Sequence, residues 1–292
     1  AASACRMQKP ASSEAFDGPL RVHYNGRWQE VTVTIVALLT DCGASDGFTA
    51  AMKGVILGIA SETVLVDISH DVPPQDIRAG AFVVNAASPY FPSGTIFCTV
   101  VDPGVGSNRR IIAVRTARAL FVAPDNGVLS WALHHEDVLT IVEVTDPQYW
   151  LPRVSRTFHG RDIFAPVAAH LAAGLPIERL GRQVRDLLDL PLPGPRLEAD
   201  GDVRGDVIYV DHFGNLVTGI ELDPRDGRII NLPAGAQSAY LDAVSRIQVR
   251  DRWIVALANS YADVQPGEML ALVGSSGHLE LAMRNGSAAL AL

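Results

Sequence analysis

Strand-like and helix-like segments alternate through the first half of the chain, and this alternation constrains the fold more than any other feature. Short β-branched, apolar runs are followed by segments whose apolar residues recur with helical spacing. Strands are expected over 31–40, 64–68, 94–101 and 138–144 with a hairpin over 111–122, and helices over 48–59, 76–88, 128–134 and 163–173. Such alternation predicts an α/β domain with a mainly parallel, layered sheet.

Four acidic residues lie at or just after the ends of predicted strands: Asp41, Asp67, Asp102 and Asp125. In layered α/β sheets, ligands bind outside the carboxyl ends of the strands. We therefore expect at least two of these acids to contact a ligand. Asp102 opens a bend rich in proline and glycine that ends with Arg109, so the carboxylate and the guanidinium can fold back onto each other. An ordinary ion pair in a tight loop is the alternative interpretation.

The pattern changes after the helix-like segments, where three prolines fall within residues 191–195. Beyond this stretch, short β-like runs are separated by turn residues, which predicts an all-β, barrel-like domain. The expected organisation is an N-terminal extension over 1–30, the α/β domain over 31–190, a linker over 191–202 and the barrel over 203–292.

Composition excludes several classes of partner. A net charge of −8 and a pI near 5.4 argue against a nucleic-acid partner, and no apolar run is long enough to predict a membrane span. Cys5, Cys42 and Cys98 are odd in number and widely spaced, so they predict no disulfide framework. We expect a reducing, cytoplasmic location, because residues 1–17 also lack the apolar stretch of a secretory signal.

A metal site is a possible interpretation of several side chains. The residues with suitable ligand types are His70, Asp71, Asp102, His159, Asp162 and His170. No pair of them has a diagnostic spacing, and neighbouring arginines disfavour a cation, so no metal site is expected. The sequence contains no H-E-x-x-H signature of zinc proteases, no G-x-S-x-G motif and no phosphate-binding loop motif.

Two further candidates carry both a structural and a functional interpretation. His159 lies between a phenylalanine and a glycine ahead of a predicted helix, so its ring is either structural or faces a cleft. The stretch from Asp211 to Asn215 has the composition of a β-turn. It could equally recognise a polar ligand, with a carboxylate and with an amide that can pair with the edge of a heterocycle.

Taken together, the motifs resemble those of a known family. They include D-I-S-H-D-V-P-P (67–74), V-V-D-P-G-V-G-x-x-R-R (100–110), F-H-G-R-D-I-F-A-P (158–166), D-x-F-G-N-L-V-T (211–218) and S-S-G-x-L-E-L-A (275–282). The chain resembles the S-adenosyl-L-methionine (SAM) hydroxide adenosyltransferases, or SAM hydrolases, which are related to the fluorinases and chlorinases. Nine such stretches occur in order from about residue 33 to the C-terminus.

This resemblance implies an α/β domain followed by a β-barrel domain, and a homotrimer with active sites between subunits. The implied reaction is attack of water or hydroxide at C5′ of SAM, which yields adenosine and L-methionine without a further cofactor. The family's triad of Asp, Arg and His corresponds to Asp102, Arg109 and His159. Because the halogenating relatives lack this set, the resemblance favours hydrolysis over a SAM-dependent chlorinase or a non-catalytic SAM- or adenosine-binding protein.

The resemblance also assigns binding residues. Asp41 is similar to the acid that holds the ribose hydroxyls, Asp211 to the acid that holds the methionine amine, and Asn215 to the amide that reads adenine. Ser276 and Arg284 lie where the C-terminal motif contacts the methionine end or the adenine. Two positions depart from the family pattern, since Cys42 replaces a common aromatic residue and Phe97 a common histidine.

Overall fold

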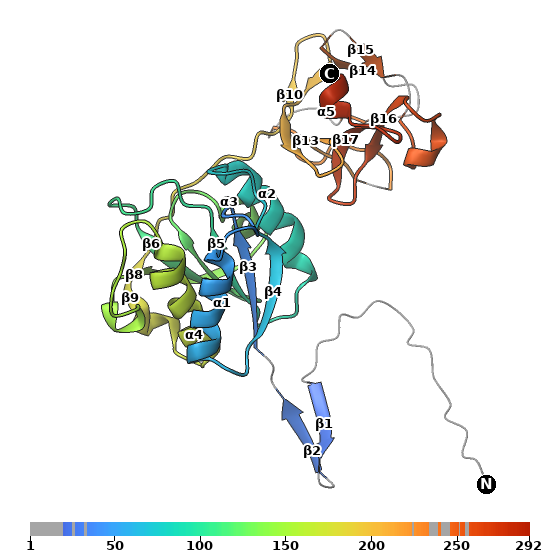
Figure 1. Ribbon diagram of the computed structural model, residues 1–292. Helices are drawn as coiled ribbons and strands as arrows, with labels where there is room; N and C mark the ends of the chain where they lie inside the picture. The colour runs from blue at the N-terminus through green and yellow to red at the C-terminus, as the bar shows by residue number, and fades with distance from the viewer. Residues whose placement is uncertain are drawn as a thin grey trace, which may run out of the picture.

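The computed structural model describes residues 20–24, 27–31, 34–223, 225–233, 239–240, 246–250, 252–254 and 257–292 (Figure 1). Most of the predicted N-terminal extension lies outside these ranges. Its described part is an antiparallel hairpin formed by β1 (Leu20–Tyr24) and β2 (Arg27–Val31). Within the described ranges, no helix is both long enough and apolar enough to cross a membrane.

The core of the N-terminal part is a seven-stranded sheet with the strand order β4-β3-β5-β7-β6-β8-β9. Its strands are β3 (Ile35–Thr40), β4 (Val64–Ser69), β5 (Ile96–Val100), β6 (Ile111–Thr116), β7 (Leu120–Pro124), β8 (Val138–Val144) and β9 (Gly181–Val184). β4, β3, β5 and β7 are parallel to one another, whereas β6 and β9 run in the opposite direction. The predicted α/β domain with a mainly parallel sheet is confirmed.

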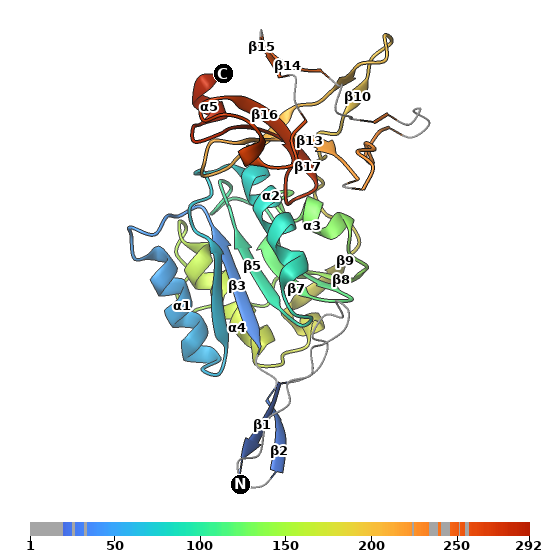
Figure 2. The same ribbon diagram turned by 90° about the vertical axis from the view of Figure 1, so that its right-hand side faces the viewer.

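Helices cover both faces of this sheet (Figure 2). They are α1 (Phe48–Ile59), α2 (Ile77–Ala87), α3 (Ser130–His134) and α4 (Ala165–Ala172), with a π-helical turn η3 (Gly160–Phe164) and short 3₁₀ turns η1 (Ser88–Tyr90), η2 (Pro147–Tyr149) and η4 (Ile177–Leu180). Side chains alternate between the faces of a strand. In β3, Leu38 therefore packs in the cluster of α1 and α4, while Leu39 packs in that of α2 and α3. Burial on both faces explains the uninterrupted apolar run of β3.

The C-terminal part contains antiparallel strands in separate small sheets. β12 (Val207–Val210), β13 (Leu216–Glu221), β17 (His278–Met283) and β16 (Met269–Val273) form one sheet, β10 (Arg196–Leu197) pairs with β11 (Val203–Arg204), and β14 (Ile247–Val249) pairs with β15 (Arg252–Ile254). A 3₁₀ turn η5 (Tyr261–Asp263) and a helix α5 (Ala288–Ala291) complete this part. The antiparallel β architecture is as expected, β10 lies inside the predicted linker, and a closed barrel stays a prediction.

The C-terminal strands lie above the carboxyl end of β3, and the β1–β2 hairpin lies beyond its amino end (Figure 2). An apolar contact joins the two parts, because the Phe82 ring of α2 stacks on the Tyr209 ring of β12 with centroids 4.6 Å apart. The Trp131 indole N–H also donates to the carbonyl oxygen of Leu190 over 3.0 Å. The C-terminal strands therefore border the edge of the sheet where its parallel strands end.

Candidate active site

Asp102, Arg109 and His159 come together just beyond the carboxyl end of β5. Arg109 Nε donates to Asp102 Oδ1 over 2.8 Å, and Arg109 Nη2 donates to Asp102 Oδ2. Arg109 Nη2 also lies 2.9 Å from His159 Nδ1. The Arg109 and Asp102 side chains are only 10% and 6% exposed, so this is not a solvated surface pair. The structure thus assembles the three residues that the motifs singled out.

A glycine explains how residues fifty positions apart meet. Gly106 has a φ of +76°, and a Cβ built there would lie 2.4 Å from the carbonyl oxygen of Arg156. Only glycine tolerates both this left-handed backbone and this approach. The bend after Asp102 is therefore seated directly on the segment that leads to His159.

The segment that contains His159 is held in place by a buried carboxylate. Asp162 is fully buried, accepts from the backbone N–H of Ser155 over 2.8 Å, and pairs with Arg161 over 2.6 Å. The π-helical turn η3 begins immediately after His159, three residues before the predicted helix start. Such turns are rare and are frequent at functional sites, and the sequence pattern did not reveal this one.

The protonation state of His159 follows from its neighbours. Burial, and then the charge of Arg109, lower the pKa of His159 below its ordinary value of about 6.5, although Asp102 opposes the shift. A guanidinium can only donate, so His159 Nδ1 must accept the Arg109 proton. His159 is therefore neutral at pH 7, with its own proton on Nε2.

A hollow of about 120 Å³ opens beside these residues. Asp41, Asp102 and His159 line it, together with Thr40, Cys42, Met52, Val100, Val105, Thr157, Phe158 and Gly160. Most pockets for drug-sized ligands enclose about 300–1,000 Å³, so this hollow accommodates only part of such a ligand. Sequence reasoning missed Thr40 and Thr157 as pocket residues, although Thr40 precedes Asp41 and Thr157 lies two residues before His159.

The other two acids at strand ends are occupied by protein groups. Asp67 pairs with Lys53 over 2.6 Å and with His70 over 3.0 Å. Asp125 accepts from Arg110 Nε over 2.7 Å. The expectation that at least two of the four acids contact a ligand stays a prediction, and the pocket lining narrows it to Asp41 and Asp102.

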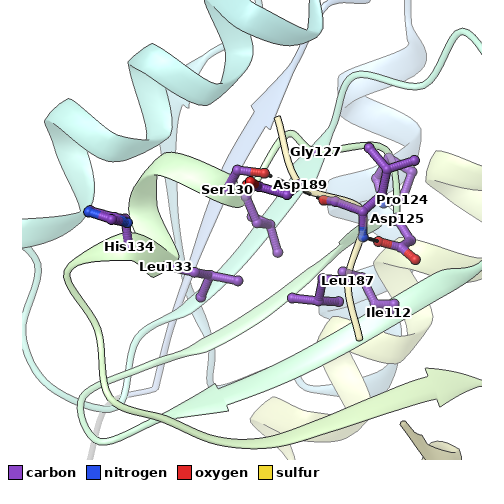
Figure 3. Close-up of a pocket in the computed structure, with 11 residues that line it drawn as sticks. Ile112, Pro124, Asp125, Gly127, Ser130, Leu133, His134, Leu187 and Asp189 are labelled. Atoms are coloured by element: carbon purple, nitrogen blue, oxygen red, sulfur yellow. Dashed lines mark hydrogen bonds between the residues drawn. The ribbon is translucent and has the colours of Figure 1, made fainter. Parts of the chain in front are cut away.

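Asp125 takes part in hydrogen bonds that hold the segment after β9 against the sheet (Figure 3). Its Oδ1 accepts from the backbone N–H of Leu188 over 2.8 Å, while Arg110 also donates to Asp186 over 3.0 Å. A second hollow of about 190 Å³ lies next to it, between α3 and this segment. In Figure 3, Leu187 and Leu133 contribute apolar walls to that hollow. The pair of Arg110 and Asp125 therefore stabilises the position of the segment after β9.

The C-terminal candidates do not line the pocket beside His159. Asp211 accepts from the Asn215 side chain and from the Asn215 backbone N–H, each over 2.8 Å, so these two residues form a closed turn. Ser276 is exposed in the turn between β16 and β17. Arg284 donates to the carbonyl oxygens of Ala262 and Val264. Their predicted contacts with substrate remain predictions.

The metal candidates are dispersed in the same way. Across the described ranges, no three His, Cys, Asp or Glu side chains converge into a group that could hold a metal ion.

Known families and proteins match this chain over most of its length. A family model for the SAM hydroxide adenosyltransferase N-terminal domain matches residues 36–181, and the model for the C-terminal domain matches residues 205–292. A protein from Salinispora tropica named (R)-S-adenosyl-L-methionine hydrolase is 40% identical over 257 residues, which cover 87% of this chain and 92% of that protein. A fluorinase from Nocardia brasiliensis is 30% identical, with 87% of this chain and 92% of the fluorinase covered.

A hydrolase of the same name from Thermus thermophilus is 37% identical and covers 88% of this chain and 94% of its own length. Among solved structures, that of an uncharacterized conserved protein from Thermotoga maritima aligns with a TM-score of 0.76 and 36% identity, covering 88% of this chain and 95% of that one. The two domain models together match more than half of the chain, and the relatives and the solved structure cover most of it. The chain therefore belongs to the SAM hydroxide adenosyltransferase family.

Proposed function

We propose that this protein hydrolyses SAM to adenosine and L-methionine by attack of water at C5′ of the ribose. The observation that carries the proposal is the buried contact of Asp102, Arg109 and His159 at the wall of a pocket. The SAM hydrolases of Salinispora tropica and Thermus thermophilus are 40% and 37% identical to this chain, compared with 30% for the fluorinase of Nocardia brasiliensis. The contact of the three residues and the higher identity to the SAM hydrolases both support water as the nucleophile.

The substrate determines which catalytic help is needed. The sulfonium of SAM leaves as a neutral thioether, so its departure requires no acid. The nucleophile is the difficulty, because bulk water has a pKa of about 15.7. Arg109 remains charged and cannot act as a base, but it can stabilise the attacking oxygen electrostatically in a site sheltered from solvent.

The hydrogen bonds divide the remaining work between Asp102 and His159. The Nδ1 lone pair of His159 is used by Arg109, so His159 orients Arg109 and offers only its Nε2–H to other groups. Each carboxylate oxygen of Asp102 has two acceptor positions, and Arg109 does not fill all of them. We therefore assign Asp102 as the proton acceptor.

A carboxylate is a strong enough base for this step if the proton of the water is transferred while the C5′–O bond forms and the C5′–S bond breaks. The water oxygen forms a bond to C5′ while the C5′–S bond breaks and its electron pair returns to sulfur. As the bond to C5′ forms, the proton of the attacking water passes to Asp102, so the oxygen carries hydroxide character that the charge of Arg109 stabilises. Asp102 ends protonated, and neutral adenosine and methionine result. Neither a metal nor another cofactor enters this scheme.

The same proposal assigns Asp41 to the ribose hydroxyls, since it lines the pocket with the triad. Asp211, Asn215, Ser276 and Arg284 are assigned to the methionine and adenine ends. They line no part of this pocket, which encloses only about 120 Å³. Both facts support a homotrimer in which the C-terminal strands of one subunit, in a barrel-like arrangement, complete the pocket of the next. The cysteine pattern supports a cytoplasmic location.

Product analysis in the presence of chloride tests the proposed reaction. The protein is incubated with SAM and an excess of sodium chloride, and the products are identified by mass spectrometry. We expect adenosine and L-methionine in equal amounts. The appearance of 5′-chloro-5′-deoxyadenosine would identify a chlorinase, and retention of intact SAM bound to the protein would identify a binding module.

A further inference from the structure

A chain of four polar side chains runs behind the pocket wall, from α1 to the end of β3. Lys53 Nζ donates to Asp67 Oδ2 over 2.6 Å, and Asp67 Oδ1 lies 3.0 Å from His70 Nε2. His70 Nδ1 lies 2.9 Å from Thr40 Oγ1. Only 9% of His70 and 1% of Thr40 are exposed. We call Lys53, Asp67, His70 and Thr40 the Thr40 relay; only its last member lines the pocket.

The relay has a defined direction of hydrogen bonding. An ionised carboxylate only accepts, so His70 Nε2 is protonated and donates the hydrogen bond to Asp67. In the neutral ring, Nδ1 then accepts the hydroxyl proton of Thr40. Thr40 Oγ1 is left as an acceptor, and the thiol of Cys42 lies 2.9 Å from it. Burial raises the pKa of Cys42, so this thiol keeps its proton and can donate.

These contacts fix the backbone on both sides of Asp41. Thr40 is held from one side by the ring of His70, and on the other side the backbone N–H of Gly43 donates to the His70 carbonyl oxygen over 2.8 Å. Asp41 Oδ2 accepts from the backbone N–H of Gln75 over 2.7 Å. Among the described residues, Asp41 Oδ1 has no hydrogen-bond partner. Asp41 Oδ1 and the second acceptor position of Oδ2 thus remain for a ligand, and their placement depends on His70.

We propose that His70 is a positioning residue, which places the Asp41 carboxylate to receive two adjacent hydroxyls of a ribose. This inference rests on the proposed function, because it takes Asp41 as the ribose-binding acid. His70 itself does not line the pocket, so its effect on the ligand is exerted through Thr40 and Asp41.

The test compares the binding of adenosine and of 2′,3′-dideoxyadenosine to the full-length protein by isothermal titration calorimetry. His70→Leu removes both ring nitrogens, while His70→Asn retains an acceptor near the position of Nδ1 and serves as the conservative variant. His135→Leu is the matched control, because His135 is exposed and does not line the pocket. Thr40→Val provides a second, nearly isosteric variant that removes the last hydrogen bond of the relay.

We expect His70→Leu and Thr40→Val to weaken adenosine binding by about three- to tenfold, the equivalent of one hydrogen bond. Binding of 2′,3′-dideoxyadenosine, which lacks both hydroxyls, should change by less than about twofold, and His70→Asn should recover most of the loss. Unchanged adenosine binding, or an equal loss for both nucleosides, would overturn the proposal. Adenosine binding needs no turnover, so a wild-type protein that binds adenosine but leaves SAM intact would refute only the proposed hydrolysis.

Discussion

Two neighbouring arginines, Arg109 and Arg110, each pair with a buried aspartate, but the two pairs have different roles. Arg109 binds Asp102 and also His159, and this pair opens onto a pocket. Arg110 binds Asp125 and Asp186, and this pair fastens the segment after β9 to the sheet. Both acids follow or end central strands and both are buried. The difference lies in the third partner, which is a neutral histidine in one case and a second carboxylate in the other.

The comparison shows that an ion pair at a strand end does not by itself identify an active site. Asp125 has both carboxylate oxygens used by the protein, one by Arg110 and one by the backbone of Leu188. Asp102 accepts hydrogen bonds from Arg109 alone within the described part of the chain, and no backbone N–H of a distant segment binds it there. The two pairs are distinguished by their further partners: His159 for the proposed catalytic pair, and Asp186 and the backbone of Leu188 for the structural one.

The largest expected effect comes from Arg109→Ala. Loss of a preorganised donor that stabilises developing charge typically costs about 10²–10³-fold in turnover, so we expect kcat to fall by about this factor. The measurement is the rate of adenosine release from SAM by chromatography. Turnover within threefold of wild type would contradict the role of Arg109, provided that circular dichroism shows the variant to be folded.

Substitutions at His159 separate the two possible roles of its ring. The Oδ1 atom of His159→Asn can replace Nδ1 as the acceptor for Arg109, whereas His159→Gln places its polar atoms nearer to Nε2. If His159 orients Arg109, Asn should retain at least about tenfold more kcat than Ala, and more than Gln, consistent with a hydrogen bond to a charged group. Equal losses for Asn, Gln and Ala would instead favour His159 as the base.

The pH dependence of kcat tests the neutral state of His159. Its pKa is lowered by burial and by Arg109, so protonation becomes appreciable only below about pH 6.5, the ordinary value. We expect kcat to be level from pH 8 to about 6.5 and to fall below it, as the protonated ring loses its acceptor for Arg109. The part of this acid limb that is due to His159 should disappear in His159→Asn. A rate that rises on acidification would show that the protonated form is active.

Arg110→Ala should have the smallest effect on catalysis and a clear effect on stability. It removes the partner of Asp125, whose side chain is only 4% exposed. Breaking a buried pair costs about 3–5 kcal/mol. Because Arg110 is 25% exposed, we expect about 2 kcal/mol. Urea unfolding measures this loss, and kcat should stay within about threefold of wild type. A large loss of kcat at unchanged stability would remove the distinction between the two pairs.

The sequence predicted well those features that depend on neighbours in the chain. The bounds of α1 follow from its apolar spacing, and α2 lies within the range 76–88 expected for it. The contact of Asp102 with Arg109 could also be expected, because a seven-residue bend brings their side chains together.

Features that depend on distant partners could not be read in this way. Asp125 looked equivalent to Asp102 until the structure placed Leu188, 63 residues away, on its carboxylate. His70 had the chemistry of a metal ligand, but both of its ring nitrogens are engaged by Asp67 and Thr40. β9 is short and its central residues are exposed, so it has no apolar pattern to reveal it. In each case the partner, rather than the residue type, determines the role.

Isotope labelling tests the central claim most directly. The protein is incubated with SAM in ¹⁸O-labelled water, and the products are analysed by mass spectrometry. Attack of water at C5′ predicts one ¹⁸O atom in the 5′-hydroxyl of adenosine and unlabelled L-methionine. Labelled homoserine together with 5′-methylthioadenosine, or adenosine without the label, would contradict the account.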